Sequence, residues 1–87
     1  MSASIYHDLG SVAQEQRQWT QARDYFLKAL EGFAEFQDQH GLMVVLGSLG
    51  RLWRESGDGS LPGMVAKRLG IAPDEVESGL RKMLEGE

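Results

Sequence analysis

The chain has 87 residues, a formal net charge of −4 and a hydrophobic fraction of 41%, values that allow one small domain with a modest core. It contains no cysteine, which excludes disulfides, cysteine zinc sites and a thiol nucleophile. No apolar run approaches the roughly 20 residues that span a bilayer, and the N-terminus lacks the pattern of a signal peptide. We therefore expect a cytoplasmic protein without a membrane partner, and the acidic balance argues against generic nucleic-acid binding.

Hydrophobic periodicity predicts three long helices in the first two thirds of the chain. Apolar residues recur at three- and four-residue steps over residues 4–16, 19–37 and 42–55, which is the pattern of a helix that buries one face. The polar stretch 14–18 has the composition of a tight turn between the first two helices, and the segment 38–41 is predicted to be a loop.

Two shorter helices are predicted after the turn-forming segment 56–59, where glycine and aspartate alternate. Ser60 is the expected N-cap of a helix over 61–69, which ends at Gly70. The last helix is predicted over 73–85, with acidic residues in its first turn and basic residues in its last turn, an order that complements the helix dipole. No segment alternates with period two, so we predict an all-α fold of about five helices in antiparallel hairpins, without strands.

An internal repeat suggests how these helices are organised. The pattern Tyr6-x-x-Leu9-Gly10-x-x-Ala13 recurs 40 residues later as Leu46-x-x-Leu49-Gly50-x-x-Trp53, and the first copy is followed by Ala22, Phe26 and Ala29. An aromatic residue, a Leu-Gly pair and a later Ala-aromatic-Ala set resemble the tetratricopeptide repeat (TPR) family. In physical terms, small residues let two helices approach and large residues fill the space around the contact.

The resemblance implies a domain organisation. Residues 4–37 form the first repeat, 42–57 begin a second and degenerate repeat, and 58–87 form C-terminal capping helices, as at the end of a bacterial-type TPR array. The second copy departs from the pattern because Pro62, Ala66 and Leu69 occupy the positions of the Ala-aromatic-Ala set. The implied function is that of a protein–protein interaction or assembly module, a scaffold without catalysis.

One and a half repeats leave an apolar flank uncovered, because array units bury their faces against neighbours and about three repeats are usually needed. We therefore expect either a fragment of a longer array or a homo-oligomer that forms through the N-terminal hairpin. Exchange of helices between copies would serve the same purpose. This makes an oligomerisation element of a larger regulatory protein the first alternative function.

The resemblance also places a binding groove, because the first helix of each TPR hairpin lines the concave side. It implies a protein- or peptide-binding surface made of His7, Ser11, Gln14, Arg51 and Arg54. The two arginines could hold a carboxylate or an acidic peptide, since guanidinium pairs with such groups bidentately. The alternative interpretation is a solvated helix face with an ion pair between Arg51 and Glu55.

No constellation of residues predicts catalysis, a metal or a cofactor. His7 and His40 lie 33 residues apart without ligand spacing, and we interpret both as surface or loop histidines. Gly47-Ser48-Leu49-Gly50 lacks the spacing of a nucleophile elbow. We therefore expect a protein that is not an enzyme.

A helix-turn-helix DNA-binding module at 61–85 is the second alternative. Two short helices joined around Gly70 resemble that motif. However, residues 73–85 have a net charge of −2, and the acidic end is the one that would meet the bases. The charge therefore argues against a nucleic-acid partner.

Overall fold

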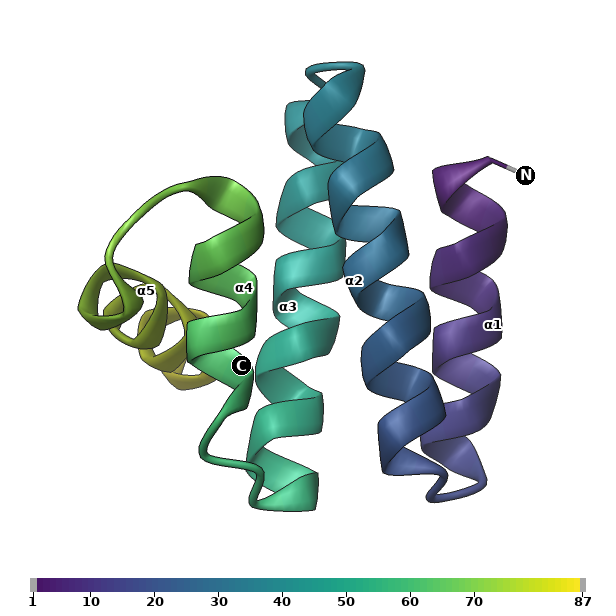
Figure 1. Cartoon of the computed structure of the whole chain (residues 1–87). Helices are drawn as coiled ribbons and strands as arrows, with labels where there is room; N and C mark the ends of the chain where they lie inside the picture. The colour runs from purple at the N-terminus through teal and green to yellow at the C-terminus, as the bar shows by residue number, and fades with distance from the viewer. Residues whose placement is uncertain (1, 87) are drawn as a thin grey trace.

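The computed structural model describes residues 2–86, and within them it contains five helices and no strand. The helices are α1 (Ala3–Glu15), α2 (Trp19–Glu35), α3 (Gln39–Ser56), α4 (Leu61–Leu69) and α5 (Pro73–Glu85) (Figure 1). The predicted all-α class is confirmed, and the bounds of the last two helices match the prediction.

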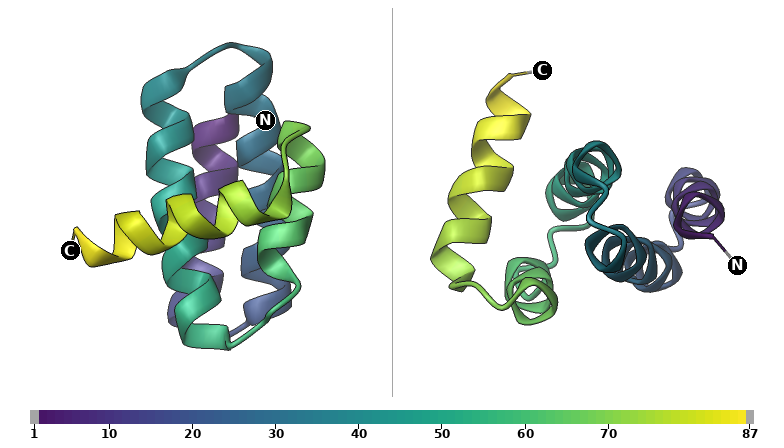
Figure 2. Two further views of the ribbon diagram at one scale, coloured as in Figure 1. Left: turned by 90° about the vertical axis from the view of Figure 1, so that its left-hand side faces the viewer. Right: turned by 90° about the horizontal axis from the view of Figure 1, so that it is seen from above.

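The first four helices form two layers of antiparallel neighbours. Seen from above, α1 and α3 lie in one layer and α2 and α4 lie in the other (Figure 2). α5 does not continue this alternation, because it runs across α3 and α4 instead of alongside them and contacts both. Its C-terminal end extends past α3 on the side of the α1 and α3 layer.

The two turns within this stack have the same backbone geometry. Arg17 and Gln37 adopt left-handed conformations, with φ of 58° and 54°. The amide after each of them reaches back five residues, to the carbonyls of Ala13 and Phe33, at 2.9 Å in both turns. This is the Schellman arrangement, which satisfies the last carbonyls of a helix and is usually built on glycine.

The turn at Gln37 corrects two predicted boundaries. Residues 36–37 are not helical, although the prediction extended the second helix over them, because the chain reverses at Gln37. The third helix begins at Gln39, inside the predicted 38–41 loop. The carboxylate of Asp38 accepts a hydrogen bond from the Gly41 amide at 2.9 Å and so caps this helix.

Ser60 does not cap α4, contrary to the prediction. Its side chain accepts no hydrogen bond from the amides of the first turn. Its hydroxyl donates instead to the Asp58 carboxylate at 2.6 Å. The Ser60 amide donates to the same carboxylate at 3.0 Å. The hydroxyl bond and then the amide bond lower the pKa of Asp58, because both stabilise its charged form.

The first hairpin is held by a ring packed against bare backbone. Phe26 of α2 is fully buried, and its ring lies over Gly10 of α1. A Cβ atom on Gly10 would lie 2.6 Å from two carbons of that ring, closer than atoms can approach. Ala22, also fully buried, keeps the two helices close. The predicted role of Gly10 in this hairpin is therefore confirmed.

In the second hairpin, the glycine of the repeat is covered by a side chain from a different helix. Gly50 of α3 has the sequence position of Gly10, but Ala66 stands where Phe26 would recur. The space over Gly50 is taken by Leu80 of α5, whose side-chain carbon would lie 3.6 Å from a Cβ there. Leu80 is 2% exposed and belongs to the same buried core as Phe26. The crossing helix therefore supplies the large side chain that α4 lacks.

This packing predicts opposite effects for two glycine-to-alanine changes. Gly10→Ala should lower the free energy of unfolding by about 1–3 kcal/mol, because the new methyl group overpacks a buried ring. Gly47→Ala in α3 should raise it by about 0.5–1 kcal/mol, because nothing lies within 4 Å of the added atom and helix propensity improves. Urea unfolding followed by circular dichroism measures both free energies. Equal effects of the two changes would contradict the contact between Phe26 and Gly10.

Candidate functional site on the α1 and α3 face

The layer formed by α1 and α3 exposes a polar surface, which we call the α1–α3 face. The two helices run in the same direction and are tied by two side-chain hydrogen bonds. One joins His7 Nε2 to Ser48 Oγ at 2.8 Å, and the other runs from Gln14 Nε2 to Glu55 Oε2 at 2.9 Å. Both bonds span 41 residues, one more than the sequence repeat.

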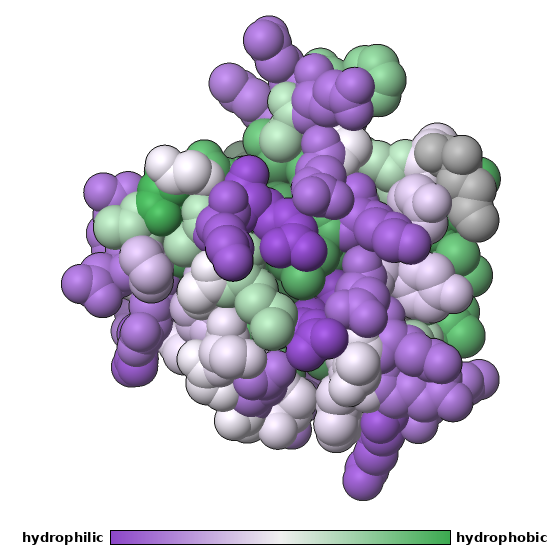
Figure 3. Space-filling view, in the orientation of Figure 1, coloured by the Kyte–Doolittle hydropathy of each residue, from purple (hydrophilic) through white to green (hydrophobic). Residues whose placement is uncertain are grey.

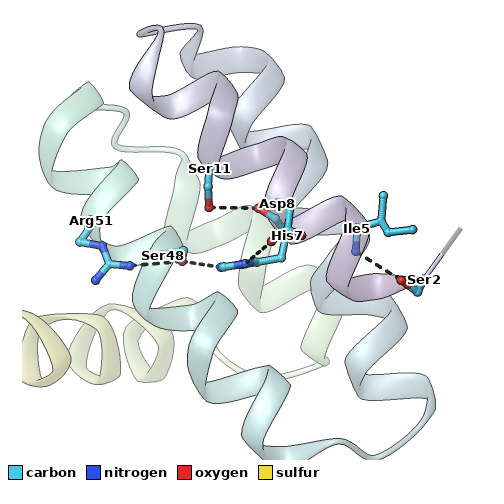
Figure 4. A network of polar contacts seen from close by, with 7 residues as sticks. All are labelled: Ser2, Ile5, His7, Asp8, Ser11, Ser48 and Arg51. Carbon is cyan, nitrogen blue, oxygen red and sulfur yellow. Dashed lines mark hydrogen bonds and ion pairs between the residues drawn. The ribbon is translucent and has the colours of Figure 1, made fainter.

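The His7 bond belongs to a chain of polar contacts (Figure 4). Arg51 donates from Nη2 to Ser48 Oγ at 3.4 Å. Because arginine can only donate, the Ser48 hydroxyl accepts the bond from Arg51. In the bond between Ser48 and His7, the tautomer of the ring decides which side chain donates. Ser48 is 2% exposed and the His7 ring lies against Phe26, 5.5 Å between centroids. This chain therefore anchors the α1–α3 face to the core.

Serine, histidine and aspartate meet here, but not as a hydrolytic triad. His7 Nδ1 and the Asp8 carboxylate are 4.0 Å apart, beyond hydrogen-bond distance. Ser48 Oγ is buried under α1, where a substrate could not reach it. The amides around Ser48 are inside α3 and bond to its own carbonyls, so they cannot form an oxyanion hole. The set has a structural role.

A hollow of about 280 Å³ opens beside the Gln14–Glu55 bond. It is lined by Ser11, Gln14 and Glu15 of α1 and by Arg51 and Glu55 of α3. Two carboxylates and one guanidinium make it polar and of mixed charge, and Arg51 is exposed. Such a surface can exchange hydrogen bonds and ion pairs with a polar peptide segment.

A second hollow of about 230 Å³ lies on the same face near the start of α1. His7 and Asp8 line it from α1, and Asp38, His40 and Val44 line it from the start of α3. Within residues 2–86, no three histidine, cysteine or carboxylate side chains gather in a way that could hold a metal ion. The His7 side chain that bonds to Ser48 is thus part of the lining of this second hollow.

The predicted groove residues come together only in part. Ser11, Gln14 and Arg51 line the first hollow, whereas Arg54 is exposed on α3 and is not among its lining residues. His7 lines the second hollow instead, and its side chain is only 20% exposed. The interpretation of His7 as a surface histidine is therefore wrong, because Ser48 and Phe26 enclose it. His40 is exposed as predicted, although within α3 and not in a loop.

Two residues of this face escaped the sequence analysis, namely Ser48 and Glu55 as partners of α1. The 40-residue period of the repeat could have identified both partners. A period of 40 residues places α1 and α3 in parallel, so each residue of α1 faces the residue about 40 positions later. Applied to His7 and Gln14, that rule points to Ser48 and Glu55 within one residue.

The comparison with known families agrees with this architecture. The profile of the family described as Tetratricopeptide repeat matches residues 1–58, two thirds of the chain, and the chain belongs to this family. Proteins of this family are typically non-catalytic scaffolds for protein–protein interaction. Neither the search of curated proteins nor the search of solved structures found a match. Among residues 2–86, no helix has the length and apolar content needed to cross a bilayer.

The anchoring role of Ser48 is testable. Ser48→Ala should lower the free energy of unfolding by about 1–3 kcal/mol, because the half-buried His7 ring and Arg51 both lose a partner. The matched control is Ser78→Ala on the exposed face of α5, expected to stay within about 0.5 kcal/mol of the parent. Denaturant titration measures the free energy of unfolding of both variants. Similar losses in the two would show that the polar contacts of Ser48 contribute nothing to stability.

Proposed function

We propose that the chain is a protein-interaction module whose α1–α3 face binds a segment of a protein partner. The observation that supports this most is the convergence of Ser11 and Gln14 of α1 with Arg51 of α3 around one exposed polar hollow. The site residues remain those implied by the sequence, His7, Ser11, Gln14, Arg51 and Arg54. His7 positions the two helices, and the others offer polar groups to the partner.

The charges of the hollow describe the partner segment. Arg51 suits a carboxylate, whereas Glu15 and Glu55 suit donors such as lysine, arginine or a free backbone amide. A purely acidic peptide would meet two carboxylates for every guanidinium in this hollow. The segment proposed is therefore polar and carries both charges.

We further propose that residues 58–87 act as a C-terminal cap. Support comes from Leu80, which packs over Gly50 where the next large side chain of the repeat is missing. The side of α5 turned away from the core is polar, with Asp74, Ser78 and Lys82 exposed. A polar outer face is what a terminal unit of a helical array needs.

Peptide selection tests the proposed binding face. Peptides selected from a random phage-displayed library on the full chain should lose about tenfold or more in affinity for Arg51→Ala, because a charged hydrogen-bond donor is removed. Isothermal titration measures the affinities. Arg68→Ala is the control, since Arg68 pairs with Glu31 at 3.3 Å, away from this face.

Two results would contradict the proposal. In the first, no peptide is enriched on the immobilised chain beyond its enrichment on the bare plastic support. In the second, every enriched peptide binds the Arg51→Ala chain and the parent chain with equal affinity. Peptides that lose affinity only for Arg68→Ala would place the binding surface on the other layer.

Self-association through the N-terminal hairpin is a second candidate. Ile5 and Val12 lie two turns apart on α1, and their side chains are 46% and 51% exposed. Leu9 lies between them and is half-buried. Apolar surface also shows in the space-filling view along the edge of the molecule where α1 lies (Figure 3). A second copy covering this stripe would remove it from water.

Sedimentation equilibrium over a concentration series tests this candidate. If the stripe mediates assembly, the parent chain should show mass above 9.7 kDa that rises with concentration, and Val12→Glu should abolish that rise. Ser78→Glu on α5 serves as the control for added charge. A constant monomer mass, or a rise that Val12→Glu leaves unchanged, would contradict assembly through α1.

The helix-turn-helix alternative receives less support. Asp74 and Glu75 are exposed at the start of α5, where a recognition helix would approach the bases. Phosphates would be repelled at that end. We therefore do not propose DNA binding.

A further inference from the structure

A third hollow, different in character from the two on the α1–α3 face, is lined by α5, by α3 and by the end of α4. Figure 2 shows how α5 crosses α3 and α4. We call this third hollow the cap hollow. Its walls are apolar side chains, among them Leu46 of α3, Ile71 after α4, and Val76 and Met83 of α5. Its volume is about 120 Å³, somewhat less than the engineered cavity of roughly 150 Å³ that binds benzene. The cap hollow therefore has room for one aliphatic side chain.

Gly79 keeps this hollow open. It lines the hollow from α5 and is exposed, and nothing lies within 4 Å of a Cβ atom added to it. Glycine inside a helix is unfavourable relative to alanine, and no packing contact within residues 2–86 requires glycine here. A larger side chain at this position would extend into the mouth of the hollow.

The margin of the cap hollow combines apolar surface with one charge. Ile71, which lines the hollow, is 42% exposed. Among the lining residues that the structure describes, only Glu75 is charged, and its exposed carboxylate forms no hydrogen bond or ion pair within residues 2–86. The apolar cap hollow is complementary to an aliphatic side chain, and the unpaired carboxylate beside it is complementary to a cation next to that side chain.

We propose that the cap hollow binds one aliphatic side chain of a partner protein, next to a lysine or arginine that pairs with Glu75. A second copy of this chain that docks through α1 is a poor occupant. Its exposed aliphatic residues on α1 are flanked by Asp8 and Glu15, which would be repelled by Glu75. The occupant is therefore a basic segment of another protein. This binding is independent of the α1–α3 face and does not involve Arg51.

Methionine methyl NMR on the full chain tests the proposal. Met83 lines the hollow, whereas Met64 of α4 does not and is an internal control. The probe is an acetylated and amidated helical peptide of about 15 residues, built of alanine and glutamine with one leucine and, one turn away, one lysine. The Met83 methyl resonance should shift saturably and the Met64 resonance should not.

Matched peptides and variants separate the two parts of the recognition. Replacing the leucine of the peptide by alanine should abolish the shift, and replacing the lysine by glutamate should weaken binding about fivefold. Gly79→Leu, which fills the mouth, should weaken binding about tenfold or more. Gly79→Ala is the folding control and should melt at or above the parent temperature. Arg51→Ala should bind the probe like the parent chain.

The proposal is overturned by any of the following results. These are no Met83 shift up to millimolar peptide, equal shifts with the leucine-free peptide, equal affinity for the glutamate peptide, or unchanged affinity in Gly79→Leu. A Met83 shift that depends on the concentration of the chain alone would assign the hollow to a second copy and would also overturn it.

Discussion

The structure depends on one contact, the ring of Phe26 against the bare backbone of Gly10. Because glycine has no Cβ atom, α1 and α2 come close enough to bury Ala22 and Phe26 completely. That close approach sets the position of α1 relative to α3, since α3 also packs against α2. The cross-helix bonds of His7 and Gln14, and with them the hollow at Arg51, follow from this placement. Replacing the glycine would therefore affect the surface proposed to bind a partner as well as the core.

The second hairpin shows what happens when the large residue is lost. Ala66 leaves space over Gly50, and Leu80 reaches that space from a helix that crosses the stack. The crossing has two consequences. It buries the end of the second hairpin, and it leaves the cap hollow between α5 and α3, because a helix that runs across another contacts it over a short length only. The same change in sequence thus accounts for the proposed cap and for the second proposed binding surface.

Sequence periodicity predicted the helices well, because each has a continuous apolar face and the last two have glycine or proline at their ends. It failed at Gln37, where a left-handed turn is built without glycine and carries no local signal. It also misjudged His7, because a lone histidine beside an aspartate looks exposed until the partner helix is placed. Ser48 could have been found from the 40-residue period. The cap hollow could not, because it depends on the direction in which α5 crosses α3, which is decided by packing across the whole domain.

The two hairpins depend on the placement of two side chains, Phe26 over Gly10 and Leu80 over Gly50. Nuclear Overhauser contacts measure both placements directly. In a spectrum of the labelled full chain, the Gly10 α-protons should contact the ring protons of Phe26, and one of them should be shifted upfield by that ring. The Gly50 α-protons should contact the methyl groups of Leu80 in the same spectrum. Gly10 protons without contacts to Phe26, or Gly50 protons that contact residues of α4 in place of Leu80, would contradict the packing from which every proposal above follows.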